Sequence, residues 1–316
     1  VCRRYTKYRP DIDGLRAIAV FAVILFHVSP TTLSGGFIGV DVFFVISGYL
    51  ISTIIFDALN KDSFSFFYFY SRRIKRIFPA LILVISVCLV FGWFVLLPSE
   101  YKHLGKYAFT GASFVSNFFF WQEAGYFDTA AHVKPFLHLW SLSLEEQFYV
   151  VWPFLIWFIW KTNYNLFTLI VLLTASSLLL NISNVQQNLT ATFYSPQTRL
   201  WELTSGSLLA WLTIFKKEWF VHINDKMGEY IAPLVTQIII PIVYKEPKKV
   251  SINVAGRILP EILATIGLVF LAYGFLEINE DLNFPGGWAL VPVIGTLFLI
   301  MAGPDTFWNK IFLSNN

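Results

Sequence analysis

An arginine and a histidine enclose an unbroken apolar run near the start of this chain. The run RAIAVFAVILFH extends from Arg16 to His27, with ten apolar residues between the two ionisable ones. Because an α-helix turns by about 100° per residue, eleven steps bring both ionisable residues onto one face, about 16 Å apart along the axis. Ionisable side chains in an apolar helix are costly and usually face a bundle interior or a wet cavity. The segment therefore predicts a membrane helix with a functional face.

The composition agrees with a membrane setting. Of 316 residues, 56% are hydrophobic and only 14% are charged, and the mean hydropathy is +0.61. These values are typical of a multi-pass membrane protein and exclude a soluble domain, so we expect a lipid bilayer as partner and no nucleic acid. Cys2 and Cys88 lie far apart, and no disulfide framework or metal site is predicted.

Apolar runs predict an all-α polytopic membrane protein, a bundle of about eight transmembrane helices in this chain. The expected spans are roughly 15–32, 36–56, 79–98, 139–160, 165–181, 199–215, 258–276 and 287–303. Lys and Arg accumulate on cytoplasmic loops, and their distribution here places both chain ends in the cytoplasm. The segment 57–78 is then a basic cytoplasmic loop, and Pro79 begins the third helix.

Two further segments are not expected to span. If 104–121 crossed the membrane, Lys216 and Lys217 would lie outside, so this segment is predicted to be re-entrant or interfacial. The run 231–244 is short, and Pro233 and Pro241 interrupt it.

Ionisable residues on three segments are predicted at comparable depths. At the helical rise, His27 lies about 18 Å into the first helix, Asp41 about 8 Å into the second and Glu145 about 10 Å into the fourth. These depths predict an acid and base centre in the outer half of the bundle. The basic residues predict a cytoplasmic entrance, and they are Arg16, Arg72, Arg73 and Arg76.

Each of these residues has a purely structural alternative. His27 could be a packed, hydrogen-bonded core residue, and Asp41 could serve only as a structural hydrogen-bonding group. The arginine cluster could be a topology signal that binds anionic lipid. Glu145 and Glu146 are adjacent and about 100° apart, so at most one is expected to face inward.

Five ordered sequence blocks resemble the membrane-bound acyltransferase-3 family. The first is YRPDIDGLRAIAV followed by His27 and GGFIGVDVFFVISGYLIS, and the second is FYSRRIKRIFPAL. The others are FLHLWSLSLEEQFYVVWP, SPQTRLWELTSGSLLA and FPGGWALVPVIGT. The similarity is closest to bacterial members that O-acetylate envelope polysaccharides.

The resemblance implies transfer of an acyl group, usually acetyl, from cytoplasmic acetyl-CoA to a glycan hydroxyl outside a bacterial inner membrane, with the N-terminus in the cytoplasm. The acceptor stays open between lipopolysaccharide O-antigen, exopolysaccharide, peptidoglycan and a lipid-linked precursor. No metal is implied. In such an enzyme, Arg16, Arg72, Arg73 and Arg76 would hold the phosphates of CoA.

The resemblance also implies roles for the other candidates. His27 would be the catalytic residue, either as a general base or as a covalent acyl carrier. Asp41 or Glu145 would orient its imidazole. Three residues of the fourth helix are placed on the acceptor side by position alone, and they are Trp140, Ser141 and Ser143.

The chain is predicted to be one integral-membrane domain over 1–316, truncated at its C-terminal end. Complete family members continue to about ten helices, and many carry an SGNH-type domain, which could here be a separate domain or protein.

Two other functions stay open. One is a transporter or flippase for an anionic lipid or glycan, and the other is an inactive truncated remnant.

Overall fold

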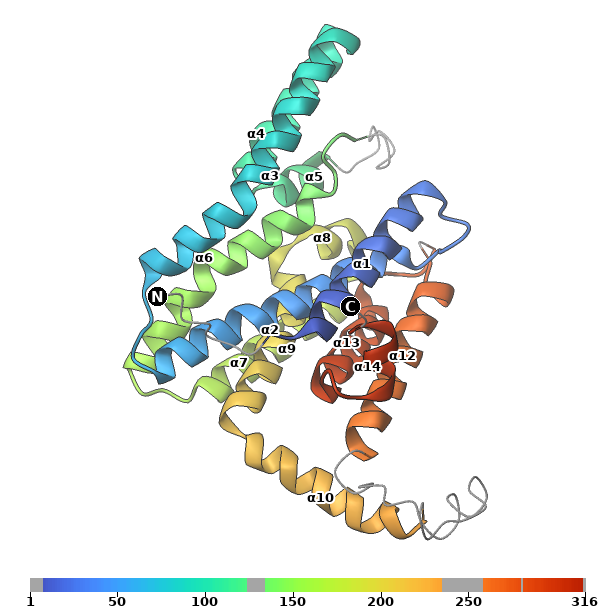
Figure 1. Cartoon of the computed structure of the whole chain (residues 1–316). Coiled ribbons are helices and arrows are strands. Elements are labelled where there is room, and N and C mark those ends of the chain that lie inside the picture. Colours follow the sequence, from blue (N-terminus) through green and yellow to red (C-terminus); the bar gives the residue numbers. More distant parts are fainter. Residues whose placement is uncertain (1–7, 124–133, 235–257, 280, 315–316) are drawn as a thin grey trace. The chain divides into compact units, whose positions relative to one another are not determined.

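A computed structural model describes residues 8–123, 134–234, 258–279 and 281–314 (Figure 1). Every regular element in these ranges is a helix. Four helical segments of the described chain are long and apolar enough to cross a membrane: Gly36–Asn60, Phe66–Val95, Leu166–Asn184 and Ile258–Glu277. The chain is therefore an all-α, multi-pass membrane protein, as predicted.

The chain divides into two compact units. The terminal unit comprises residues 1–54, 202–282 and 287–316, and the middle unit comprises 55–201 and 283–286. Helices α2 (Gly39–Asn60) and α9 (Pro196–Phe215) each contribute residues to both units. The prediction of one domain over the whole chain stays a prediction.

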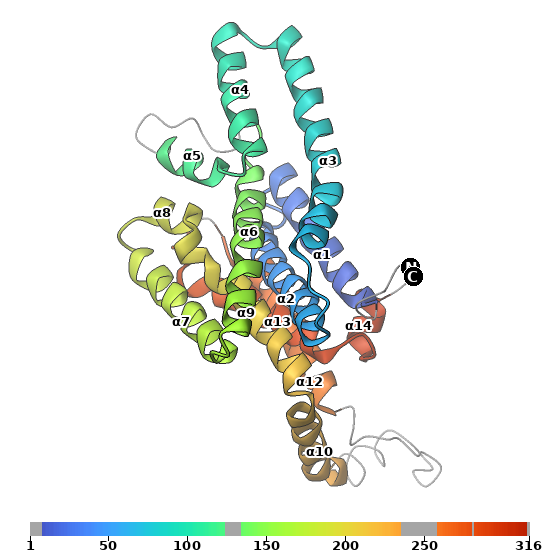
Figure 2. The same cartoon turned by 90° about the vertical axis from the view of Figure 1, so that its left-hand side faces the viewer.

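The terminal unit brings together helices from both ends of the chain. These are α1 (Pro10–Val28), the 3-10 helix η1 (Gly36–Ile38), most of α2 and α9, α10 (Lys217–Leu234), α12 (Ile258–Glu277), η5 (Gly286–Ala289), α13 (Leu290–Ala302) and α14 (Phe307–Phe312). Helices α12 and α13 pack side by side (Figures 1 and 2).

Two glycines allow α2 and α9 to meet backbone to backbone in this unit. A Cβ atom added to Gly48 would lie 1.8 Å from the Leu203 carbonyl oxygen, and one added to Gly206 would lie 2.1 Å from that of Val45. Beside this contact, Ser52 Oγ donates to Ser207 Oγ over 2.7 Å. Small residues are used where membrane helices approach closely, because any side chain would separate them.

Arg9 ties the start of α1 to two other helices of the same unit. Its guanidinium forms a two-point ion pair with buried Asp11 and donates to the Ile300 carbonyl over 2.7 Å. It also reaches the Tyr49 hydroxyl at 3.5 Å. Burial opposes the charge, but the bonds to Asp11 outweigh it and raise the pKa of Arg9.

The middle unit contains α3 (Phe66–Val95), α4 (Pro98–Ala112), α5 (Ser116–Glu123), α6 (Leu139–Lys161), α7 (Leu166–Asn184) and α8 (Leu189–Tyr194). Helices α3 and α6 run side by side in opposite directions (Figures 1 and 2). The rings of Phe66 and Phe154 are stacked, with their centroids 4.5 Å apart. One turn later in α3, the Tyr70 hydroxyl donates to the Val150 carbonyl over 2.8 Å.

The predicted start of the third helix is wrong by thirteen residues. Helix α3 begins at Phe66, where the Ser65 side chain caps it by accepting from the Tyr68 backbone N–H. Pro79, expected near the start, lies inside the helix. A proline removes one backbone hydrogen bond, and here the cap, the helix-forming residues before it and the packing on α6 outweigh that loss.

The other predicted helices form with smaller shifts. Helix α1 begins at Pro10 rather than near 15, and η5 precedes α13 where one span over 287–303 was expected. Residues 104–121 fall on α4 and α5, of 15 and 8 residues, which suits a segment that does not cross. Most of 231–244 lies outside the described residues, so that prediction stays open.

Candidate active site

His27 lies in the last turn of α1, and its side chain is exposed. Its Nδ1 atom lies 2.8 Å from the Val23 carbonyl oxygen, one turn earlier in the same helix. A carbonyl oxygen can only accept, so Nδ1 carries the hydrogen, and in the neutral ring Nε2 then holds the lone pair. The ring is thereby oriented with its basic nitrogen away from its own helix.

In triad-like sites a carboxylate accepts the hydrogen bond from the Nδ1–H group of the histidine. Here the Val23 carbonyl oxygen accepts it. Asp41, expected in the orienting role, is fully buried in the first turn of α2, where the helix dipole stabilises a negative charge. Arg16 is half-buried on α1.

The arginine cluster lies on a helix rather than in the predicted loop, because α3 begins at Phe66. Arg72 and Arg76 are both exposed and lie four positions apart in the helix, so they share one face. Arg73 is half-buried and turns toward α6.

Arg73 and Glu145 belong to one cluster. The guanidinium carbon of Arg73 lies 4.5 Å from the ring centroid of Tyr149, and the Tyr149 hydroxyl donates to Glu145 Oε2 over 2.8 Å. Glu146 is buried and interacts electrostatically with both Arg73 and Glu145. Both glutamates therefore belong to the charged cluster around Arg73, whereas the sequence predicts that at most one of them faces inward.

The predicted separation of these charges is not seen. Glu145 was placed in the outer half of the bundle and Arg73 at the cytoplasmic entrance. The structure instead brings them together, because Arg73 lies two turns inside the antiparallel α3–α6 pair rather than in a loop below it.

The three residues predicted to lie on the acceptor side have different surroundings. Trp140 is buried against Phe193, with ring centroids 4.6 Å apart. Ser143 is fully buried, and its hydroxyl lies 2.7 Å from that of Ser116 on α5, so it holds two helices together. Ser141 is half-buried and donates to the His138 carbonyl over 3.2 Å.

Arg199 was missed by the sequence reasoning. It is only 1% exposed, and its guanidinium carbon lies 5.7 to 5.8 Å from three aromatic ring centroids, those of Trp140, Phe193 and Phe284. An arginine keeps its charge when buried and stacks well on aromatic faces. The available signal was a single arginine in the first turn of a predicted membrane helix.

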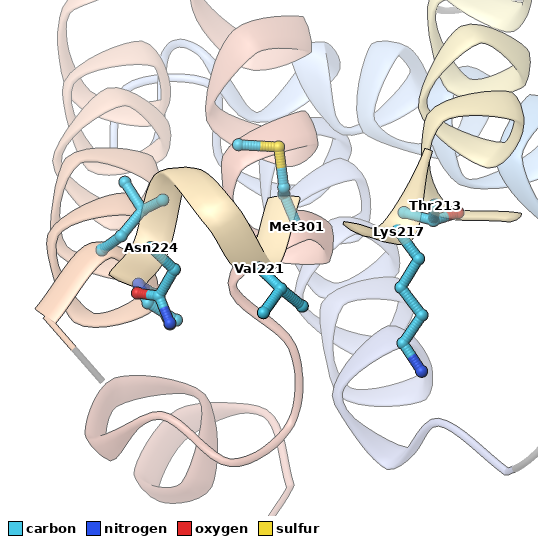
Figure 3. A pocket seen from close by; sticks show the side chains of 7 residues that line it. Thr213, Lys217, Val221, Asn224 and Met301 are labelled. Carbon is cyan, nitrogen blue, oxygen red and sulfur yellow. The ribbon is translucent and has the colours of Figure 1, made fainter. Parts of the chain in front are cut away.

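The terminal unit also contains a pocket of about 280 Å³ (Figure 3). Its walls come from the neighbouring ends of α9, α10, α12 and α13, and its lining residues are Thr213, Lys217, Val221, Asn224, Leu259, Pro260 and Met301. The lining includes none of the predicted site residues. In the described ranges, no three His, Cys, Asp or Glu side chains are grouped to hold a metal ion.

Residues 9–312 match the sequence profile of the acyltransferase-3 family, described as an acyltransferase domain. The chain belongs to this family. The match covers nearly the whole chain and includes both units, so the resemblance of the five sequence blocks is confirmed.

Two curated relatives carry names that specify an activity. Over 318 residues the chain is 34% identical to "Peptidoglycan O-acetyltransferase OatA" of Listeria monocytogenes, covering 98% of this chain and 46% of the relative. It is 37% identical over 212 residues to "O-acetyltransferase OatA" of Staphylococcus aureus, covering 65% and 35%. The chain thus spans less than half the length of these relatives. No solved structure matches it.

Proposed function

We propose that this acyltransferase-3 chain transfers an acetyl group from cytoplasmic acetyl-CoA to a hydroxyl group of peptidoglycan on the other side of the membrane. The family supports acyl transfer, and the name of the Listeria monocytogenes relative supports the acceptor. The helices that can cross a bilayer support a membrane location. We place the protein in the bacterial cytoplasmic membrane with its N-terminus in the cytoplasm, because of its basic segments.

The observation that carries the proposal is the state of His27. Its Nδ1–H is bonded to the Val23 carbonyl, so Nε2 is the basic atom. In the proposed reaction Nε2 takes the proton of the acceptor hydroxyl, while the oxygen of that hydroxyl forms a bond to the carbonyl carbon of the acetyl group. The carbon–sulfur bond then breaks, and the leaving thiolate takes the proton from the imidazolium, which gives free CoA and an O-acetylated sugar.

The arginines are proposed to hold the donor. Arg72 and Arg76 expose their guanidinium groups on one face of α3, and such groups bind phosphate oxygens in a two-point manner. Arg16 and Arg73 are proposed as further contacts of the same donor. Asp41 and Glu145 are proposed to stabilise positive charge that develops during transfer.

The proposal is tested by acetyl-CoA binding to the purified chain in detergent, with His27→Ala and Arg72→Ala beside it. We expect saturable binding that Arg72→Ala weakens and His27→Ala leaves intact. Acetyl transfer to peptidoglycan fragments is then measured in the same samples. No binding by the unaltered chain would contradict the proposed function.

A further inference from the structure

Arg73 and Glu146 carry opposite charges in one cluster, yet they do not pair. Within the described part of the chain, Arg73 makes no hydrogen bond and no ion pair, and its guanidinium stacks on the Tyr149 ring. Glu146 is only 8% exposed, and its Oε1 atom has no hydrogen-bond partner among the described residues. The half-buried guanidinium of Arg73 and a buried oxygen of Glu146 can therefore each accommodate a further hydrogen-bond partner.

Two polar side chains next to Glu146 on α6 already use their hydrogens elsewhere. The Tyr149 hydroxyl gives its hydrogen to Glu145. The Gln147 amide uses both hydrogens, because it donates to the Phe114 carbonyl over 2.8 Å and to Asn117 Oδ1 over 2.9 Å. Leaving a buried carboxylate oxygen without a donor is costly, so a bound group that donates a hydrogen bond to Glu146 would be stabilised.

The ligand must offer a hydrogen-bond donor to Glu146 and an acceptor to Arg73. A bare phosphate would suit Arg73, but its charge would repel Glu146. A secondary amide offers one N–H and one carbonyl oxygen on opposite sides of the same group. The pantetheine arm of acyl-CoA contains two such amides, next to the phosphates that Arg72 and Arg76 are proposed to bind.

We propose that Glu146 and Arg73 form a recognition site for the pantetheine arm of the donor. Glu146 accepts the N–H of one pantetheine amide, and Arg73 donates to a carbonyl oxygen of the same arm. This inference rests on the proposed function and adds to it a reason why the donor is a CoA thioester rather than any acetyl compound.

The experiment measures the dissociation constant of acetyl-CoA for the full chain in detergent, comparing Glu146→Leu, Glu146→Gln and the exposed control Glu277→Leu. A hydrogen bond to a charged group contributes enough that Glu146→Leu is expected to weaken binding about tenfold or more. Glu146→Gln keeps an acceptor oxygen and is expected to stay within about threefold. The control should bind like the unaltered chain.

A second arm keeps the test decisive if Glu146→Leu does not fold. Two acetyl-CoA analogues, each with one pantetheine amide replaced by an ester, lack one N–H at a time. The unaltered chain alone is expected to bind one of them about tenfold more weakly than acetyl-CoA. Where Glu146→Leu does fold, it should bind that analogue and acetyl-CoA alike.

Four results would overturn the inference. Equal losses in Glu146→Gln and Glu146→Leu would mean that only the negative charge beside Arg73 matters. Equal binding of both ester analogues by the unaltered chain would exclude an amide contact. Unchanged binding by Glu146→Leu would exclude a contact between Glu146 and the donor while leaving the proposed function intact. Absence of acetyl-CoA binding by the unaltered chain would overturn both the inference and the proposed function.

Discussion

The Arg73 guanidinium lies over the Tyr149 ring, 4.5 Å from its centroid, and that ring's hydroxyl bonds to Glu145. One aromatic residue thus contacts a cation through its face and an anion through its edge. A guanidinium over an aromatic face gains about 0.5–2 kcal/mol, more when it is desolvated. Tyr149 is therefore a positioning residue for both charges.

Tyr149 variants can separate these two contacts. Tyr149→Phe keeps the ring under Arg73 and loses only the bond to Glu145, so acetyl-CoA affinity should stay within about threefold. Tyr149→Leu removes the ring as well and should weaken binding about tenfold. Isothermal titration of both variants checks this, and equal affinities would show that the stack does not position Arg73 for the donor.

His27→Ala should lower acetyl transfer by a factor of about 10² to 10⁴, the usual contribution of a general base. Its acetyl-CoA dissociation constant should not change, because the ring is proposed to act on the acceptor hydroxyl and not on the donor. Transfer is measured as acetate released from peptidoglycan by mild alkali. A variant that transfers acetyl groups at the normal rate would remove His27 from the mechanism.

Combining Arg72→Ala with Arg76→Ala should weaken acetyl-CoA binding about tenfold and reduce its dependence on salt, because both proposed phosphate contacts would be lost. Lys75→Ala is the matched control, since Lys75 is an exposed cation between them on the same helix. Equal losses in the control would indicate a general effect of positive charge, and no loss in the double variant would leave these arginines as topology signals.

Gly48→Leu should prevent α2 and α9 from meeting. A new Cβ would lie 1.8 Å from the Leu203 carbonyl, and no rotamer can relieve a clash with backbone. Overpacking of this kind costs about 1–3 kcal/mol or more, so we expect a lower melting temperature in detergent. Gly105→Ala on α4 is the control, because its Cβ would meet nothing within 4 Å, and there alanine should stabilise the helix by about 0.5–1 kcal/mol.

Membrane orientation can be tested with single cysteines in a chain whose Cys2 and Cys88 are replaced by serine. Lys61→Cys lies in the exposed turn before α3 and should be labelled from the cytoplasm. Thr31→Cys lies in the exposed turn after α1 and should be labelled only from outside. The reverse pattern would contradict the proposed orientation of donor and acceptor.

The helices could largely be predicted from the sequence, because apolar runs of the right length have few alternatives in a membrane protein. The sequence predicts a loop for the basic stretch before Pro79 because of its charge and because a proline is typical of a helix start. Both are local signals. Tertiary contacts decide otherwise, since Phe66, Tyr70 and Arg73 each contact α6 and hold the additional turns of α3 in place.

The candidate site could be predicted only where it depends on one helix. The sequence spacing places Arg16 and His27 on one face of α1, and the ring of His27 is oriented by a bond within that helix. The proximity of Arg73 to Glu145 and Glu146 depends on the register of α3 against α6, that is, on which residues of the two helices lie opposite one another. Spacing within each helix carries no information about that register.

The bond between His27 and the Val23 carbonyl also limits how an acetylated histidine could behave. If Nε2 attacked the thioester, the ring would become an acetylimidazolium that still holds its Nδ1 hydrogen. A carboxylate at that position could remove the proton and leave a neutral, longer-lived acetylimidazole, whereas a main-chain carbonyl has no capacity to accept one. As long as the bond to the Val23 carbonyl lasts, an acetyl group on His27 would stay highly electrophilic and would pass quickly to the acceptor or to water.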